Sequence, residues 1–160
     1  MKIRQANIEK FKIIWEYSNS PTYNYFLRNL KNNNVEFWTI EESKGLIGEL
    51  YIFWNSEDKD EANGINRAYL CAFRIQKEYQ GQGYGKLLMN TVLERIKDKG
   101  FKEVTIGIDN SEFDKLNKMY SKFGFKELIK ETNIDYHFIN ANNKPTLFKE
   151  PYSLKLKVLQ

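Results

Sequence analysis

At 160 residues and 19.1 kDa, the chain has the size of one domain and can bury a sizeable core without a disulfide or a metal, so one domain over residues 1–160 with no metal site is expected. The net charge of +4 is spread along the chain, which suits an anionic small molecule but lacks the basic stripe of a nucleic-acid binder. Cys71 is the only cysteine, and neither a signal peptide nor an apolar run near the ~20 residues of a membrane span is evident, so a soluble cytoplasmic protein without a membrane partner is expected.

The first 34 residues predict one strand and two helices. Residues 2–5 form the strand, and Asn7 caps a helix whose apolar residues recur three and four positions apart. The pair Ser20-Pro21 interrupts that pattern. A second, short helix around residues 25–30 then ends in the polar run 31–34.

The next part of the chain predicts an antiparallel meander of three strands. Residues 35–40 and 46–54 are rich in β-branched and aromatic residues, and the polar, glycine-ended segment between them is a hairpin signature. The charged segment 55–64 then leads into a strand over residues 65–75. This segment contains the acidic turn Glu57 to Glu61, which we expect to be exposed to solvent.

A helix from about Gly83 to Lys99 is the clearest local prediction, because apolar residues recur at helical spacing until Gly100 stops the helix. Alternating apolar residues then predict a strand over residues 104–108. The elements expected after it are a helix striped by Phe113, Leu116, Tyr120 and Phe123, a strand over 125–130, a long irregular stretch over 132–152 and a final strand over 153–159.

A glycine-rich segment, Gln80-Gly81-Gln82-Gly83-Tyr84-Gly85, joins the last meander strand to the long helix. The first turn of a helix carries unpaired amide groups and a partial positive charge, so phosphates bind there when no side chain blocks them. Alternate glycines remove the Cβ atoms that would block such an approach, which leaves backbone amides available to a pyrophosphate. Taken alone, such a run also fits a tight turn with close packing.

Two other phosphate-binding motifs do not fit this segment. A dinucleotide fold places its glycine loop after the first strand of a parallel unit, whereas this loop follows the third strand of a meander. A P-loop ends in Lys-Ser or Lys-Thr, and neither pair ends this loop.

Residues 80–85 and 119–125 form two separated motifs. The first motif, residues 80–85, matches the pattern Gln/Arg-x-x-Gly-x-Gly/Ala. The second motif, residues 119–125, contains Tyr120 and looks like the pattern Leu-Tyr-x-x-x-Gly-Phe. In both respects the chain resembles the GNAT superfamily of acyl-coenzyme A-dependent N-acyltransferases. The approach to the loop departs from the family pattern because Lys77 replaces a proline, and Gly45 to Leu50 resembles a hairpin strand of the family. The matches follow the family's order over about residues 35–128.

The resemblance implies a single α/β domain with a mixed, mostly antiparallel central sheet of about six to seven strands, flanked by about four helices. Its fourth and fifth strands, Tyr69 to Ile75 and Val104 to Asp109, would splay apart and admit the pantetheine arm of acetyl-coenzyme A. Exposed strand edges can hydrogen-bond such an amide-bearing arm. The residues assigned to the coenzyme on this basis are Phe73, Ile75, Gln80, Gly81, Gln82, Gly83, Tyr84, Gly85, Lys86 and Asn117.

The reaction that the resemblance implies is direct attack of an amine on the thioester, without a covalent enzyme intermediate. Cys71 suits that reaction because it has no evident base partner, and we expect it to be a small buried strand residue. Tyr120 matches the family's tyrosine that protonates the departing sulfur, although its position on an apolar stripe also fits core packing. Asn117, one turn before Tyr120, could hydrogen-bond the pantetheine, and Asn110 is its rival.

Several side chains compete for the role of general base. Glu49 in the third strand and Tyr69 in the fourth are candidates to remove a proton through water, while Glu36 is a poorer one. His137, the only histidine, is expected to be a surface or loop residue. A basic helix edge either meets the 3′-phosphate of the coenzyme or is a solvated face; it consists of Lys115, Lys118 and Lys122.

The resemblance therefore implies an N-acetyltransferase that acts on a primary amine of a small molecule or of a peptide or protein N-terminus. The alternatives are a non-catalytic acyl-coenzyme A binding or sensing module and a basic nucleic-acid-binding domain, the latter less favoured. Acceptor choice is expected to depend on the aromatic segments Tyr17 to Asn34 and Thr132 to Tyr152, unless these aromatics merely cap the ends of the sheet. The identity of the amine and the oligomeric state, a homodimer included, stay open.

Overall fold

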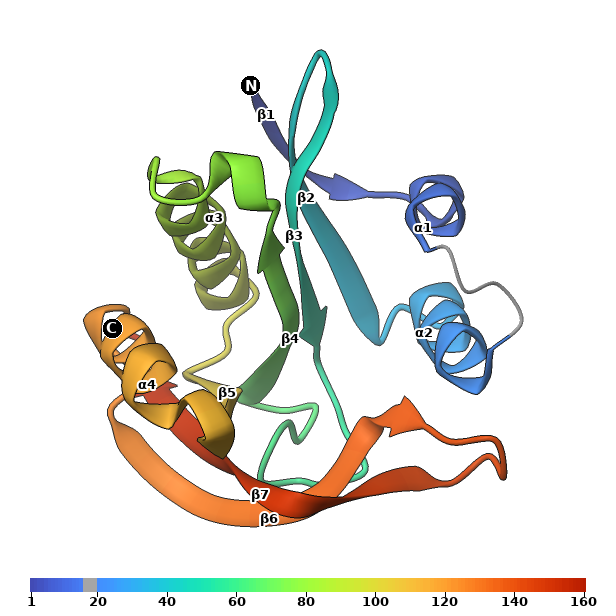
Figure 1. Cartoon of the computed structure of the whole chain (residues 1–160), viewed down its shortest axis with the longest axis vertical. Helices are drawn as coiled ribbons and strands as arrows, with labels where there is room; N and C mark the ends of the chain where they lie inside the picture. Colours follow the sequence, from blue (N-terminus) through green and yellow to red (C-terminus); the bar gives the residue numbers. More distant parts are fainter. Residues whose placement is uncertain (16–19) are drawn as a thin grey trace.

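The computed structural model describes residues 1–15 and 20–160, and within them one mixed sheet runs through the whole molecule (Figure 1). Its strands lie in the order β1-β2-β3-β4-β5-β7-β6. Only β4 and β5 pair in parallel; the other neighbours are antiparallel. The strands are β1 (Lys2–Ala6), β2 (Val35–Glu42), β3 (Gly45–Phe53), β4 (Arg67–Ile75), β5 (Glu103–Asp109), β6 (Glu127–Ile139) and β7 (Pro145–Val158).

Helices cover both faces of this sheet (Figure 1). The two faces are named here after the ligands that the sequence leads us to expect. On one face, the coenzyme face, α3 (Tyr84–Asp98) and α4 (Phe113–Lys122) enclose an aliphatic core with Ile52 and Leu70. On the other, called here the acceptor face, α1 (Ile8–Ile14) and α2 (Pro21–Lys31) pack aromatic rings against the sheet. Among the described residues, no helix is long and apolar enough to cross a membrane.

The expected α/β class, the meander β2-β3-β4 and the helix after the glycine loop are confirmed. The second helix begins earlier than predicted, at Pro21, because the Ser20 side chain accepts a hydrogen bond from the amide of Tyr23 and caps it. Serine followed by proline is thus a helix start here as well as a break.

The expected irregular stretch over residues 132–152 is wrong. This part of the chain belongs to β6 and β7, which form one long antiparallel hairpin from the pair Glu127–Leu156 to the pair Ile139–Pro145. Most side chains of β6 are partly or fully exposed, so the strand shows little apolar alternation. Its structure comes from pairing with a distant segment.

The predicted splay between β4 and β5 is confirmed. The two strands pair only from Arg67 to Leu70, opposite Glu103 to Ile106, and separate beyond those residues. Just past the last pair, the register between β3 and β4 shifts, and Ala72 adopts a left-handed φ of 56°. A bulge of this kind bends a strand and re-aims its side chains, so the departure of β4 from β5 is built into its backbone.

Candidate active site

The glycine loop leads from β4 through a short 3₁₀ turn, Lys77–Tyr79, into α3. Gly81 and Gly83 have φ angles of 75° and 89°, and a Cβ atom on either would meet nothing within 4 Å. These two glycines are therefore required by backbone conformation, and the space above them is open. Gly83 is the N-cap of α3, and no side chain of residues 1–15 or 20–160 caps the start of this helix. The first amides of α3 consequently lack side-chain partners and face an unobstructed surface.

Close approach explains the third glycine. A Cβ atom on Gly85 would lie 3.3 Å from Cζ of Phe73 and 3.5 Å from Cγ1 of Ile75. The start of α3 therefore rests directly on the part of β4 that has left β5. Gln80 strengthens this contact, because its Nε2 donates to the carbonyl of Ile75 over 3.0 Å. Gln82 similarly donates to the carbonyl of Glu78.

The remaining loop residues lie at the edges of this cradle. The Tyr84 hydroxyl donates to Oε1 of Glu42 over 3.3 Å, which ties the start of α3 to the end of β2. Lys86 is exposed and lines a groove of about 950 Å³ between α3 and α4. Lys122 lines the same groove, together with Lys97, Lys126 and Lys157. Lys115 lies instead at a separate hollow beside residues 110–114.

Tyr120 lies on α4, on the coenzyme face, with its ring centroid 6.4 Å from that of Phe73. Burial raises the pKa of its phenol to about 12. Asn117, one turn earlier, has a buried Oδ1 without a hydrogen-bond partner among the described residues. The rival Asn110 is already engaged, because its Oδ1 accepts a hydrogen bond from Oγ of Ser153 over 2.8 Å.

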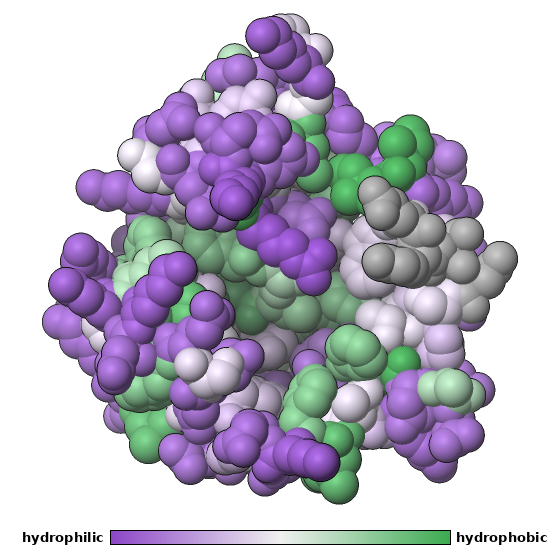
Figure 2. Space-filling model, in the orientation of Figure 1, coloured by the Kyte–Doolittle hydropathy of each residue, from purple (hydrophilic) through white to green (hydrophobic). Residues whose placement is uncertain are grey.

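A cavity of about 780 Å³ lies on the acceptor face of β4. Its walls come from α1, α2, β3, β4 and β6, and it is lined among others by Trp15, Phe26, Tyr69 and Cys71. In the space-filling view the molecule is hollowed between the two pairs of helices, with apolar residues deep inside and polar residues around the rim (Figure 2). The coenzyme face and the acceptor face therefore both reach the splayed part of β4, from opposite sides.

Glu49 reaches this cavity from β3 and is only 6% exposed. Burial raises the pKa of its carboxyl, against the opposing charge of Arg74. One carboxylate oxygen, Oε1, accepts a hydrogen bond from Nη1 of Arg74 at 3.3 Å, while Oε2 has no partner in the described part of the chain. A buried carboxyl with a free oxygen is suited to take up a proton.

The other base candidates differ in position. Glu36 binds Arg95 through two hydrogen bonds of 3.0 and 2.7 Å and does not line the acceptor cavity, so it is not proposed as a base below. Tyr69 lines the cavity, and burial raises its pKa well above the ordinary value. Burial likewise raises the pKa of the Cys71 thiol, which is half-buried in the same wall and stays neutral.

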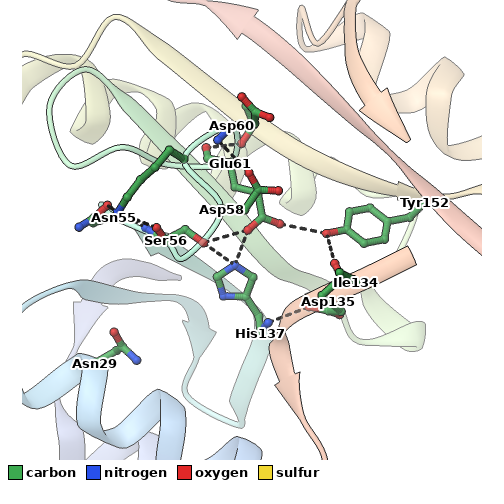
Figure 3. A network of polar contacts seen from close by, with 12 residues as sticks. Asn29, Asn55, Ser56, Asp58, Asp60, Glu61, Ile134, Asp135, His137 and Tyr152 are labelled. Carbon is green, nitrogen blue, oxygen red and sulfur yellow. Dashed lines mark hydrogen bonds and ion pairs between the residues drawn. The ribbon is translucent and has the colours of Figure 1, made fainter. Parts of the chain in front are cut away.

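His137 is not the surface or loop residue that the sequence predicts. It lies on β6, is 4% exposed, and its Nε2 is 3.0 Å from Oε1 of Glu61 (Figure 3). Glu61 is completely buried, so the expectation of an exposed acidic turn is wrong for this residue. It also accepts hydrogen bonds from Oγ of Ser56 and the hydroxyl of Tyr152. These partners, distant in sequence, compensate the buried carboxylate.

A second cavity, of about 540 Å³, lies beside the end of β5, where this strand still pairs with β7 but no longer with β4. Tyr69 and Asp135 line both this cavity and the larger one on the acceptor face. Burial raises the pKa of the Asp135 carboxyl. Asp135 carries no local sequence signal, since its position depends on β6 crossing the open end of the splay.

The two aromatic segments expected to select the acceptor meet in part at the larger cavity. Thr22 and Phe26 reach it from α2, and His137 and Phe138 reach it from β6. Two prominent aromatics of these segments, Tyr25 and Tyr136, line a different hollow, next to Pro145. Tyr17, the first residue of the first segment, lies outside the described residues.

Comparison with known proteins identifies a matching family and individual relatives of this chain. A model described as the Acetyltransferase (GNAT) family matches residues 2–125. N-acetyltransferase 8B of Homo sapiens is 29% identical over 94 residues, which cover 57% of this chain and 38% of that protein. The ribosomal protein bS18-alanine N-acetyltransferase of Haemophilus influenzae is 28% identical over 98 residues, which cover 57% of this chain and 66% of that protein. The matched region thus spans less than two thirds of each relative.

Solved structures show the same fold over almost the whole chain. A GNAT-family acetyltransferase of Staphylococcus aureus Mu50 superposes with a TM-score of 0.65 at 17% identity, covering 99% of both chains. An aminoglycoside 6′-N-acetyltransferase complexed with coenzyme A gives a TM-score of 0.64 at 14% identity, covering 99% of this chain and 97% of its own.

Proposed function

The chain belongs to the GNAT acetyltransferase family, and from this we propose that it is an N-acetyltransferase that moves the acetyl group of acetyl-coenzyme A directly onto a primary amine. The acceptor is a small molecule or a peptide or protein N-terminus. One observation carries the proposal: two features meet at the splayed part of β4. The first is the glycine-lined start of α3, which has no side-chain cap, and the second is a cavity lined by carboxyl groups.

The coenzyme face supplies the binding groups for acetyl-coenzyme A. Gly81, Gly83 and the first turn of α3 offer backbone amides to its pyrophosphate, and charge-assisted hydrogen bonds of this kind contribute about 1.5–3 kcal/mol each. The free edge of β4 at Phe73 and Ile75 offers its backbone to the pantetheine amides. The partnerless Oδ1 of Asn117 favours this residue over Asn110 as a further pantetheine contact.

The departing thiolate requires a proton, and Tyr120 is the proposed donor. Because burial raises its pKa to about 12, the phenol holds its proton throughout the physiological range. Tyr120 lies on α4 near Phe73, and thus beside the stretch of β4 that no longer pairs with β5. A proton donor positioned there assists the sulfur as it leaves.

The attacking amine must lose a proton, and Glu49 is the proposed acceptor of that proton. Its raised pKa, caused by burial, makes the carboxylate a stronger base than an exposed glutamate. The free Oε2 gives the proton a destination, while Arg74 holds the other oxygen. Transfer then needs no covalent enzyme intermediate, which agrees with a neutral Cys71 thiol.

The test is release of free thiol from acetyl-coenzyme A across a panel of primary amines, with the amide product identified by mass spectrometry. We expect thiol release to require both the enzyme and an amine, and the mass of the amine to rise by one acetyl group. Calorimetric binding of acetyl-coenzyme A without amine-dependent release would show a binding or sensing module instead.

A further inference from the structure

The acceptor cavity is lined by two carboxyl groups from different strands, Glu49 of β3 and Asp135 of β6. Arg74 is the only lysine or arginine among the described residues that line it. Its guanidinium is bound to Glu49, and its side chain is 69% exposed. The cation is therefore directed to one carboxylate at the rim, and the lining as a whole carries excess negative charge.

Asp135 occupies the junction between the two cavities described above. Among the described residues, Tyr69 is the only other one that lines both cavities. Tyr69 pairs with Thr105 just before β4 and β5 separate, so this junction lies at the root of the splay. A ligand group held by Asp135 would consequently lie close to the region where the acetyl group is transferred.

The backbone around Asp135 is fixed by a buried network. Its Oδ1 accepts a hydrogen bond from the amide of His137 over 2.8 Å, at a point where β6 shifts register against β7. The ring of His137 is held by its contact with Glu61 (Figure 3). It also stacks on the ring of Tyr69, with centroids 4.7 Å apart and planes 21° apart. Asp135 is thus a positioned group rather than part of a mobile turn.

The charge of Asp135 is not balanced by any ion pair within the described part of the chain, whereas Glu61 beside it has three partners. Partial burial of a carboxylate without a cation is unfavourable, and burial accordingly raises its pKa. A cationic ligand would recover this lost stabilisation. The neighbouring walls, which include Ile14, Trp15 and Phe26, suit an aliphatic body between two charged ends.

We propose that Asp135 is the ammonium-binding residue of the acceptor site, and that the acceptor carries a second positive charge in addition to the nitrogen that is acetylated, as an aliphatic diamine does. Glu49 is left for the reacting nitrogen, and Asp135 holds the other one. This inference rests on the proposed function, since it takes the acceptor cavity as the amine site.

The test compares two probes of similar length, 1,4-diaminobutane and butylamine, by calorimetry on the protein saturated with coenzyme A, where no transfer occurs. We expect the diamine to bind at least about 10-fold more tightly than butylamine, which corresponds to one charge-assisted contact. Asp135→Asn should remove most of that difference, because the affinity for the diamine should fall while the affinity for butylamine stays nearly unchanged. Equal affinity of both probes for the wild type would overturn the proposal, whether or not the variant folds.

Glu150→Gln is the matched control, because Glu150 is an exposed carboxylate on the rim of the cavity that Asp135 also lines. An equal loss of diamine affinity in both variants would indicate long-range charge alone and would contradict a specific role for Asp135. The proposed function fails by a different result, namely the absence of thiol release with any amine. If butylamine is acetylated as efficiently as the diamine, only the claim that the acceptor carries a second positive charge is overturned.

Discussion

Tyr120 shows how the surroundings of one side chain set its chemistry. The phenol is 7% exposed on the coenzyme face, and burial alone raises its pKa to about 12. A tyrosine in water loses its proton near pH 10, so the shift keeps this group protonated about two pH units further into the alkaline range. The same burial therefore packs the ring and keeps the phenol protonated.

We expect Tyr120→Phe to keep acetyl-coenzyme A affinity while kcat falls about 10²–10⁴-fold, because the variant preserves the ring and loses the proton donor. The wild type should show no alkaline loss of kcat from this residue below about pH 11, given a pKa near 12. Tyr23→Phe is the control, since Tyr23 is 8% exposed on the opposite face. Wild-type turnover in Tyr120→Phe, or a loss of thermal stability alone, would assign Tyr120 to the core.

Residues whose role depends on local pattern were predictable, and residues whose role depends on distant contacts were not. Tyr120 stands inside a motif, so its place on α4 followed from its neighbours. Glu61 and His137 are 76 positions apart, and nothing near either one signals that the other compensates it. Only the crossing of β6 over the acceptor face brings them together.

At the scale of elements, β4 carries the feature on which the site depends. Phe73 and Ile75 face the coenzyme side, whereas Tyr69 and Cys71 face the acceptor side. The bulge at Ala72 lies between these two pairs and holds a non-glycine residue at a φ of 56°. Such a conformation costs about 1–2 kcal/mol for an L-residue.

We expect Ala72→Gly to raise the free energy of unfolding by about 0.5–1 kcal/mol, because glycine relieves the left-handed strain and loses only part of that gain to chain entropy. Ala68→Gly is the matched control on the same strand, where Ala68 is fully buried and paired with Val104. That variant should lose about 1 kcal/mol or more. Urea unfolding measures both; equal destabilisation would contradict strain at the bulge.

The glycine loop and the terminal hairpin show why some elements are visible in a sequence. Gly81 and Gly83 need positive φ angles, and the helical period after them is regular, so loop and helix were both predictable. The strands expected over 125–130 and 153–159 are parts of β6 and β7, but the outer part of this hairpin, within residues 132–152, lacks such a signal because most of its side chains are partly or fully exposed. Its strands are defined by pairing with each other and, for β7, with β5.

At the scale of the whole molecule, the sheet separates the two proposed binding regions and joins them at one opening. The glycine loop, Tyr120 and Asn117 lie on the coenzyme face, and Glu49 and Asp135 line the cavity of the acceptor face. The parallel pair β4–β5 ends at Leu70, so the two regions meet only beyond that residue. The motifs disclosed the first region, while the second is assembled from α1, α2, β3 and β6 and was anticipated only in outline.

The central claim is that the glycine loop anchors acetyl-coenzyme A, and the most direct measurement is calorimetry on Gly83→Glu. Gly100→Glu is the matched control, because Gly100 lies beyond the other end of α3 with a φ of 96° and equally open space. Both variants suffer similar backbone strain, but only the substitution at Gly83 would place a carboxylate where the phosphates bind. We expect acetyl-coenzyme A affinity to fall at least about 100-fold in Gly83→Glu and to stay near wild type in Gly100→Glu. Unchanged affinity in a folded Gly83→Glu protein would contradict the claim.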